Sequence, residues 1–185
     1  MSTRVSSATN LSATYFMRNF YSNNRDAMKS SKRKEYSITE LAYDDSTALH
    51  RAAKKLKNYK YSDDENTDNI RQTVMALVDT YNNSIDSASN SSSNSMKRYA
   101  KQLKKLAGKY TDELEDIGIT INKDGTLKAN EELVKKADAD TLNSLFGKNN
   151  DFTNSLYRVS RQMSSSSYDD YYTSLRAGSK INLMV

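Results

Sequence analysis

The sequence contains no cysteine, no proline and no tryptophan. The lack of cysteine excludes disulfide bonds, thiol catalysis and cysteine-ligated zinc. The lack of proline removes the residue that most strongly breaks helices, so long helices are permitted. Hydrophobic residues make up only 36% of the 185 residues, and the mean hydropathy is −0.85. This composition is typical of one domain with a modest core, elongated helices and polar connecting segments.

Long hydrophobic runs are missing as well. No apolar segment approaches the roughly 20 residues that a membrane-spanning helix needs, so we expect no membrane insertion. The N-terminal segment lacks the apolar stretch of a secretory signal peptide. We therefore expect either a cytoplasmic protein or one exported without a cleaved signal peptide, and both localisations stay open at this point.

Positive charge is in slight excess, with a formal net charge of +5 at pH 7. Basic residues cluster at 29–34 and at 51–60, but acidic residues interrupt these clusters throughout. A nucleic-acid-binding surface needs a basic patch on one face of the protein. We therefore expect no nucleic acid partner, and solvated helix faces explain the basic clusters better.

Apolar residues recur at helical spacing over three segments, which predicts helices at about 38–58, 67–87 and 95–116. Ser37 and Glu40 have the spacing of a capping box at the start of the first helix. The third segment has a near-heptad apolar stripe of the kind found in coiled coils. We expect a mainly α fold in which the three helices form an antiparallel bundle. Short C-terminal helices should follow, one of them capped by Asp140 and ended by a left-handed Gly147.

Serine-rich stretches suggest how the chain is divided. The runs at 87–95 and 164–167 have the composition of linkers. The predicted organisation is a flexible or loosely packed N-terminal segment (1–36), a helical domain (37–163) and a Ser/Tyr-rich tail (164–185). In that tail, Tyr168, Tyr171 and Tyr172 are candidate interface anchors, although tyrosines filling a small core would explain them too.

One passage departs from the helical pattern. Between residues 117 and 122, isoleucines alternate with small or polar residues, which is the period of a β-strand. Asp124 and Gly125 then supply a turn. The sequence therefore predicts a β-hairpin at about 117–128, in which Gly118, Asp124 and Gly125 have structural roles.

The same passage also matches part of a degenerate EF-hand-like calcium loop at 120–131. Its candidate metal ligands are Asn122, Asp124, Thr126 and Glu131. Two residues weaken this interpretation: Thr120 occupies the first position, where an Asp anchors the ion, and Lys128 places a positive charge beside it. The hairpin explains more residues, so we favour it and expect no metal.

Residues that could perform catalysis are scarce. His50 is the only histidine, and a single histidine on a helix is usually a packed side chain. The sequence has no nucleophile-elbow motif, no phosphate-binding loop and no dinucleotide fingerprint. We expect a protein that is not an enzyme, with no cofactor and no evident small-molecule substrate.

Several short motifs occur in a meaningful order. They are VDTYNN at 78–83, LEDIGIT at 114–120, KDGTL at 123–127, and the LF pair at 145–146. Together they resemble the C-terminal half of flagellar filament cap proteins, the hook-associated protein 2 family, over about residues 70–147. In that family a helix ending in L-x-x-IGI is followed by a DGTL hairpin, a short leucine-bearing helix and an LF helix.

The resemblance implies a non-enzymatic structural protein that binds a protein partner or self-associates, with export from the cell as a further implication. Cap proteins are several times longer and carry large β-rich domains, for which 185 residues leave no room. What is implied is therefore a shared helical subdomain. The alternatives are a small cytosolic adaptor or chaperone-like helical module and a degenerate calcium-binding module.

Overall fold

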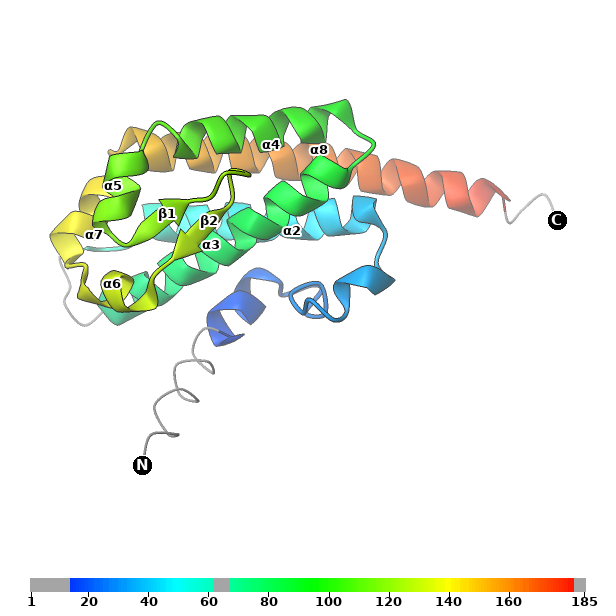
Figure 1. Cartoon of the computed structure of the whole chain (residues 1–185). Helices are drawn as coiled ribbons and strands as arrows, with labels where there is room; N and C mark the ends of the chain where they lie inside the picture. The colour runs from blue at the N-terminus through cyan, green and yellow to red at the C-terminus, as the bar shows by residue number, and fades with distance from the viewer. Residues whose placement is uncertain (1–13, 62–66, 182–185) are drawn as a thin grey trace.

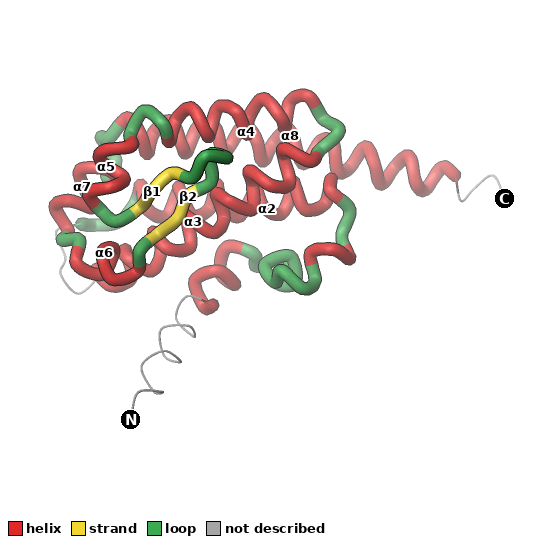
Figure 2. Tube along the Cα trace, in the orientation of Figure 1, coloured by secondary structure: helices red, strands yellow, loops and turns green. Residues whose placement is uncertain are grey.

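The computed structural model of the chain describes residues 14–61 and 67–181, with side chains described up to residue 177. Figures 1 and 2 show a helical protein with one small β-hairpin. Its elements are η1 (Arg33–Glu35), α2 (Ile38–Lys57), α3 (Thr67–Asn90), α4 (Asn94–Ala107), α5 (Thr111–Asp116), β1 (Ile119–Ile121), β2 (Leu127–Ala129), α6 (Glu131–Lys136), α7 (Ala139–Phe146) and α8 (Asp151–Ile181). This confirms the predicted mainly α class with a small hairpin.

The bundle contains α8 as a fourth long helix, which packs against α2 and α4 (Figure 1). The helix expected at 95–116 is two helices, because α4 ends at Ala107 and α5 begins at Thr111. Gly108 ends α4, and the chain turns through hydrogen bonds such as that from the Tyr110 N–H to the Ala107 carbonyl, at 3.0 Å. The apolar stripe continues across this turn, which is why periodicity alone does not reveal it.

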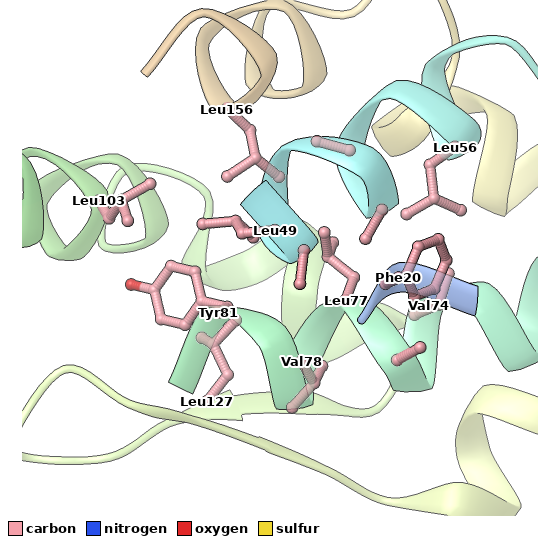
Figure 3. Packing of buried hydrophobic residues seen from close by; sticks show 14 of the residues in the cluster. Phe20, Leu49, Leu56, Val74, Leu77, Val78, Tyr81, Leu103, Leu127 and Leu156 are labelled. Atoms are coloured by element: carbon pink, nitrogen blue, oxygen red, sulfur yellow. The ribbon is translucent and has the colours of Figure 1, made fainter. Parts of the chain in front are cut away.

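One hydrophobic core joins the four helices and the hairpin (Figure 3). Leu49 of α2, Leu77 of α3, Leu103 of α4 and Leu156 of α8 are all buried, and Leu127 of β2 packs under the hairpin. Burying each leucine contributes about 1.5–3 kcal/mol relative to leaving it in water. The bundle and the hairpin therefore form one packed unit.

The core becomes polar towards the N-terminal end of α2. Asp45, Ser46, Ser84, Ser87 and Ser167 are all fully buried there. Within the described residues, the Ser84 hydroxyl oxygen is buried without a hydrogen-bond partner. Small hydroxyl side chains let the helices approach closely but add little apolar burial, so this end depends more on specific hydrogen bonds.

The linker expected at Ser164–Ser167 lies inside α8 instead. The Ser46 and Ser167 hydroxyls are 2.7 Å apart, and those of Thr47 and Ser164 are 2.9 Å apart. These pairs join α8 to α2 in antiparallel register, and the Ser46 and Ser167 hydroxyls also donate to the Tyr43 and Ser164 carbonyls within their own helices. The other serine-rich run also differs from expectation, because α3 continues to Asn90 and leaves only residues 91–93 between α3 and α4.

Residues 14–36, called here the N-terminal strap, lie against the bundle; the structure does not describe the rest of the segment expected to be loose. Residues 14–20 are helical, and Phe16, Met17, Phe20, Tyr21 and Ala27 are buried. The Arg51 guanidinium of α2 donates hydrogen bonds to the Phe20 carbonyl at 3.0 Å and the Ser22 hydroxyl at 2.7 Å. The strap therefore belongs to the folded unit.

Helix ends agree only in part with the sequence signals. The Ser37 hydroxyl accepts the Glu40 N–H at 3.2 Å, which confirms Ser37 as the N-cap of α2 and hence this half of the predicted capping box. The cap of α7 is Asp138, which accepts the Thr141 N–H at 2.7 Å, and the prediction of Asp140 is wrong. Gly147 has φ −63°, so the expected left-handed end is also wrong.

Candidate functional site

The hairpin forms where the alternating isoleucines predict it. Ile119 pairs with Ala129 and Ile121 pairs with Leu127 in an antiparallel ladder. The Gly125 N–H donates to the Asn122 carbonyl at 2.8 Å, and Gly125 has φ +81°. A four-residue turn whose last residue is a left-handed glycine is a common way to close a hairpin. The structural roles predicted for Asp124 and Gly125 correspond to this turn.

Gly118 joins α5 to β1. Its φ is +80°, and a Cβ atom added there would lie 2.3 Å from the Cβ of Leu133 in α6. Its carbonyl accepts the Asn130 N–H at 2.8 Å, which extends the ladder past the strand ends. Both the backbone conformation and the close approach of α6 require glycine here.

The candidate calcium ligands make contacts within the hairpin and α6. The Asp124 carboxylate accepts hydrogen bonds from the Thr126 hydroxyl at 2.6 Å and N–H at 2.9 Å, and these bonds lower the pKa of Asp124. Asn122 donates to the Thr126 hydroxyl at 2.9 Å. Glu131 is in α6, where it pairs with Lys135 at 3.0 Å. The turn is therefore held together by the residues that a calcium ion would need as ligands.

The hairpin is docked on α3 by two neighbouring residues. The Asn82 side-chain amide donates to the Leu127 carbonyl and its oxygen accepts the Leu127 N–H, both at 2.8 Å. The Tyr81 hydroxyl donates to the Gly125 carbonyl at 3.2 Å. Tyr81 and Asn82 belong to the VDTYNN motif, and Gly125 and Leu127 belong to the KDGTL motif. Residues of the two motifs that lie 44 and 45 positions apart in the sequence thus form one contact.

His50 lies half-buried between α2 and α8. Its ring is 4.9 Å from that of Tyr157, and its Nδ1 atom is 3.5 Å from the Ser160 hydroxyl. Burial lowers the pKa of His50, and the nearby Lys54 lowers it further. A half-buried histidine 3.5 Å from one hydroxyl resembles a packing residue more than a catalytic base.

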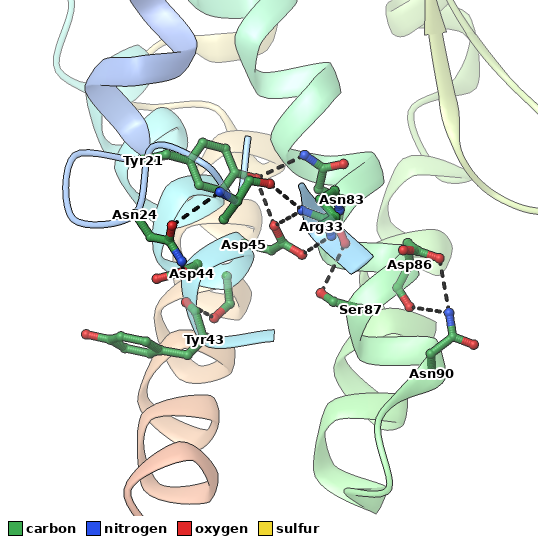
Figure 4. Close-up of polar contacts among 12 residues, drawn as sticks. Tyr21, Asn24, Arg33, Tyr43, Asp44, Asp45, Asn83, Asp86, Ser87 and Asn90 are labelled. Carbon is green, nitrogen blue, oxygen red and sulfur yellow. Dashed lines mark hydrogen bonds and ion pairs between the residues drawn. The ribbon is translucent and has the colours of Figure 1, made fainter. Parts of the chain in front are cut away.

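A buried ion pair fastens the strap to the bundle (Figure 4). Arg33 donates to both carboxylate oxygens of Asp45, at 2.8 Å and 2.7 Å, and to the Ala27 carbonyl at 2.9 Å. The Tyr21 hydroxyl donates to Asp45 at 2.9 Å and accepts from the Asn83 amide at 3.0 Å. Burial raises the pKa of Tyr21 well above its ordinary value, and the Asp45 charge raises it further.

Sequence reasoning missed this network. Asp44 and Asp45 stand out only as adjacent carboxylates, and Arg33 stands out only as part of a basic cluster. Asp45 points into the network, whereas the Asp44 carboxylate accepts from the Asn24 amide at 2.6 Å. Burial raises the pKa of Asp44 to about 6. Because a buried ion pair is weak evidence of stability, we interpret it as fixing where the strap docks.

The predicted interface tyrosines form one cluster on α2 and α8. The rings of Tyr43 and Tyr171 are stacked 5.6 Å apart and only 5° from parallel, and the Tyr168 ring meets Tyr43 edge-on at 5.7 Å. Tyr168 also contacts Tyr172 at 4.2 Å between ring centroids. The structure therefore brings Tyr168, Tyr171 and Tyr172 together and adds Tyr43 to them.

Part of this cluster faces solvent. Tyr168, Tyr172 and Leu175 are 43%, 45% and 49% exposed and recur at i, i+4 and i+7, so they share one face of α8. The last turns of α8 extend beyond the rest of the bundle (Figure 1). We call Tyr168, Tyr172 and Leu175 the tyrosine face. Large side chains exposed together in this way are typical of a protein-binding surface.

Comparisons with known proteins add no relative: no protein family, no curated protein and no solved structure matches this chain. Within residues 14–61 and 67–181, no group of three or more His, Cys, Asp or Glu side chains could hold a metal ion. In the same part of the chain, no helix combines the length and apolar character required to cross a bilayer. Among the large hydrophobic side chains that are exposed in the described residues, three gather on the tyrosine face.

Proposed function

We propose that the protein is a non-enzymatic structural protein that self-associates through the tyrosine face. The observation that carries this proposal is the exposure of Tyr168, Tyr172 and Leu175 on a helix that extends beyond its own bundle. Tyrosine supplies a large contact area with few rotatable bonds, and its hydroxyl tolerates water until the interface closes. A second copy offers the same face, so the two can pack isologously around a two-fold axis.

We further propose kinship with the helical domain of flagellar filament cap proteins, with export that uses no cleaved signal peptide. The ordered motifs support this, and so does the direct contact between VDTYNN and KDGTL through Asn82 and Leu127. Residues that hold one packed unit together are expected to occur as a set. The kinship concerns this unit and not the filament-capping activity of the longer proteins.

Sedimentation velocity over a range of protein concentrations tests the self-association. We expect wild type to form dimers or larger species, and Tyr172→Ser/Leu175→Ser to shift the equilibrium to monomer. Leu133→Ser is the matched control, because Leu133 is 46% exposed on α6, outside the tyrosine face. Wild type that stays monomeric, or a double variant that associates like wild type, would contradict the proposal.

Cell fractionation tests the export. In a flagellated host we expect the protein outside the cytoplasm, and in a strain deficient in flagellar export we expect it to be retained. Equal retention in the cytoplasm of both strains would count against export while leaving self-association untouched.

A further inference from the structure

Charge is divided sharply between two consecutive helices. Residues 94–110, which include α4, carry six basic side chains and no acidic one, and α5 directly after them carries four acidic side chains and no basic one. Within the described residues, none of these side chains takes part in an ion pair of 4.0 Å or less. The acidic set is Asp112, Glu113, Glu115 and Asp116, all exposed.

Two of these six basic side chains border a groove between α4 and α8, which lie side by side in Figure 1. The groove has a volume of about 370 Å³. Lys105 and Lys109 line it from the α4 side, and Arg158 lines it from α8. Leu106, which is partly buried, lies among them.

Arg158 belongs to a stretch that is itself free of negative charge, because no acidic residue lies between Asp151 and Asp169. Like charges gathered around a shallow groove repel one another, and an acidic partner removes that repulsion as it binds. The groove is open to solvent, so such a partner can reach its basic side chains.

We propose that this groove binds the acidic helix α5 of a second copy of the chain. The inference rests on the proposed self-association and adds a second, electrostatic interface to the tyrosine face. Charge complementarity selects the occupant: α5 presents four unpaired carboxylates, and the groove presents three unpaired cations. A glutamate or aspartate pairs well with the fork of the Arg158 guanidinium, and both lysines supply further donors.

Interfaces of this kind give specificity and fast association more than affinity, and salt screens them. The groove interface should therefore weaken as ionic strength rises, whereas contacts through the tyrosine face should persist. This difference separates the two interfaces in solution without any variant.

A charge-exchange experiment tests the proposal. Lys105→Glu/Lys109→Glu reverses the groove, and Glu115→Lys/Asp116→Lys reverses α5 at its C-terminal end, where lysine suits the helix dipole. Sedimentation velocity at low salt should show the salt-sensitive association weakened about tenfold or more for each variant alone, because like charges then face each other. An equimolar mixture of the two variants should associate again, since each reversed surface meets its reversed partner. Circular dichroism and thermal melts establish that both variants are folded.

The outcomes separate this inference from the function on which it rests. Variants that associate like wild type, or a mixture no stronger than either variant alone, would overturn the groove interface. Wild-type association that is insensitive to salt and is lost in Tyr172→Ser/Leu175→Ser would overturn it too, while leaving the proposed function standing. Binding of a short double-stranded oligonucleotide that is abolished by groove reversal, with self-association intact, would assign the groove to nucleic acid instead.

Discussion

The side-chain amide of Asn82 forms a two-way hydrogen-bonded pair with the backbone of Leu127, with both distances at 2.8 Å. The side chain of Asn82, a residue of α3, thus makes the two hydrogen bonds to β2 that the backbone of a neighbouring strand would make. The contact matters because β2 is only three residues long and has one true strand partner, β1. Isolated two-stranded hairpins are marginal in water, so this hairpin depends on what α3 supplies.

We predict that Asn82→Ala destabilises the fold by about 1–3 kcal/mol, because it leaves a partly buried N–H and carbonyl without partners. Urea denaturation gives the free energy of unfolding, and amide exchange at Leu127 should accelerate. Asn90→Ala is the control, since the Asn90 amide bonds only to Asp86 within exposed helix surface and its loss should change little. Equal effects of the two substitutions would show that the hairpin does not need α3.

Replacing each of three glycines by alanine should change the stability of the fold by a different amount. Gly118→Ala forces a left-handed backbone conformation and places a Cβ against Leu133, so we expect a loss of at least about 2 kcal/mol. Gly125→Ala has the same backbone strain, but its new neighbour is the flexible side chain of Lys104, so the loss should be smaller. Gly108→Ala has room and an ordinary φ, and should be neutral or slightly stabilising. Thermal unfolding of the three variants tests the order, and an equal loss at all three positions would contradict it.

Breaking the buried ion pair should detach the strap. Asp45→Ala leaves the Arg33 charge largely buried and unpaired, which typically costs about 3–5 kcal/mol. Replacing both partners by Arg33→Met/Asp45→Leu should cost clearly less than the two single changes summed. Limited proteolysis of residues 14–36 with chymotrypsin, which does not cleave after lysine, reports the strap directly, and Lys32→Ala, which removes an exposed ion pair with Glu35, should leave the cleavage rate unchanged. Additive single and double effects would show that the two charges act independently.

Stability should depend on pH through Asp44. Its pKa is about 6 in the fold because of burial, against about 3.9 in an unfolded chain, so the folded state binds more protons between these values. The contribution of Asp44 to the free energy of unfolding is therefore largest below about pH 4 and is lost as pH rises through about 6. Asp44→Asn should make the protein more stable than wild type at pH 7 and flatten this part of the pH profile. An unchanged profile for Asp44→Asn would refute the assignment.

Amide exchange should be slow without interruption from residue 156 to residue 167, because α8 is continuous there and the serines pair with α2. A flexible linker would instead exchange within the dead time at residues 164–167. Residues 91–93, which join α3 to α4, provide an internal reference for a short connection.

Sequence periodicity anticipated α2, α3 and the hairpin because their buried positions are apolar or β-branched. It failed where burial is polar. Ser46 and Ser167 lie inside the bundle, where their hydroxyls are 2.7 Å apart, and no pattern of hydrophobicity marks such positions. The strap network was missed for a related reason: Arg33 and Asp45 lie 12 positions apart, and no local sequence pattern marks them as partners.

The tyrosine face was anticipated in part. The tyrosines at 168, 171 and 172 were visible as a cluster, but their exposure depends on where the neighbouring helices end. Tyr171 is stacked on Tyr43, whereas Tyr172 faces outwards. Which of these tyrosines is packed and which is exposed follows from the antiparallel register of α2 and α8. Sequence alone gave no reason to place Leu175 with them.

The continuity of α8 has a mechanical consequence. A flexible linker at residues 164–167 would absorb tension by extending, but a single helix carries it undiminished into the bundle. A force applied to the C-terminal part of α8 therefore acts as shear on the hydroxyl pairs between α8 and α2, and several contacts must break together. The projecting end of α8 is therefore mechanically continuous with the bundle.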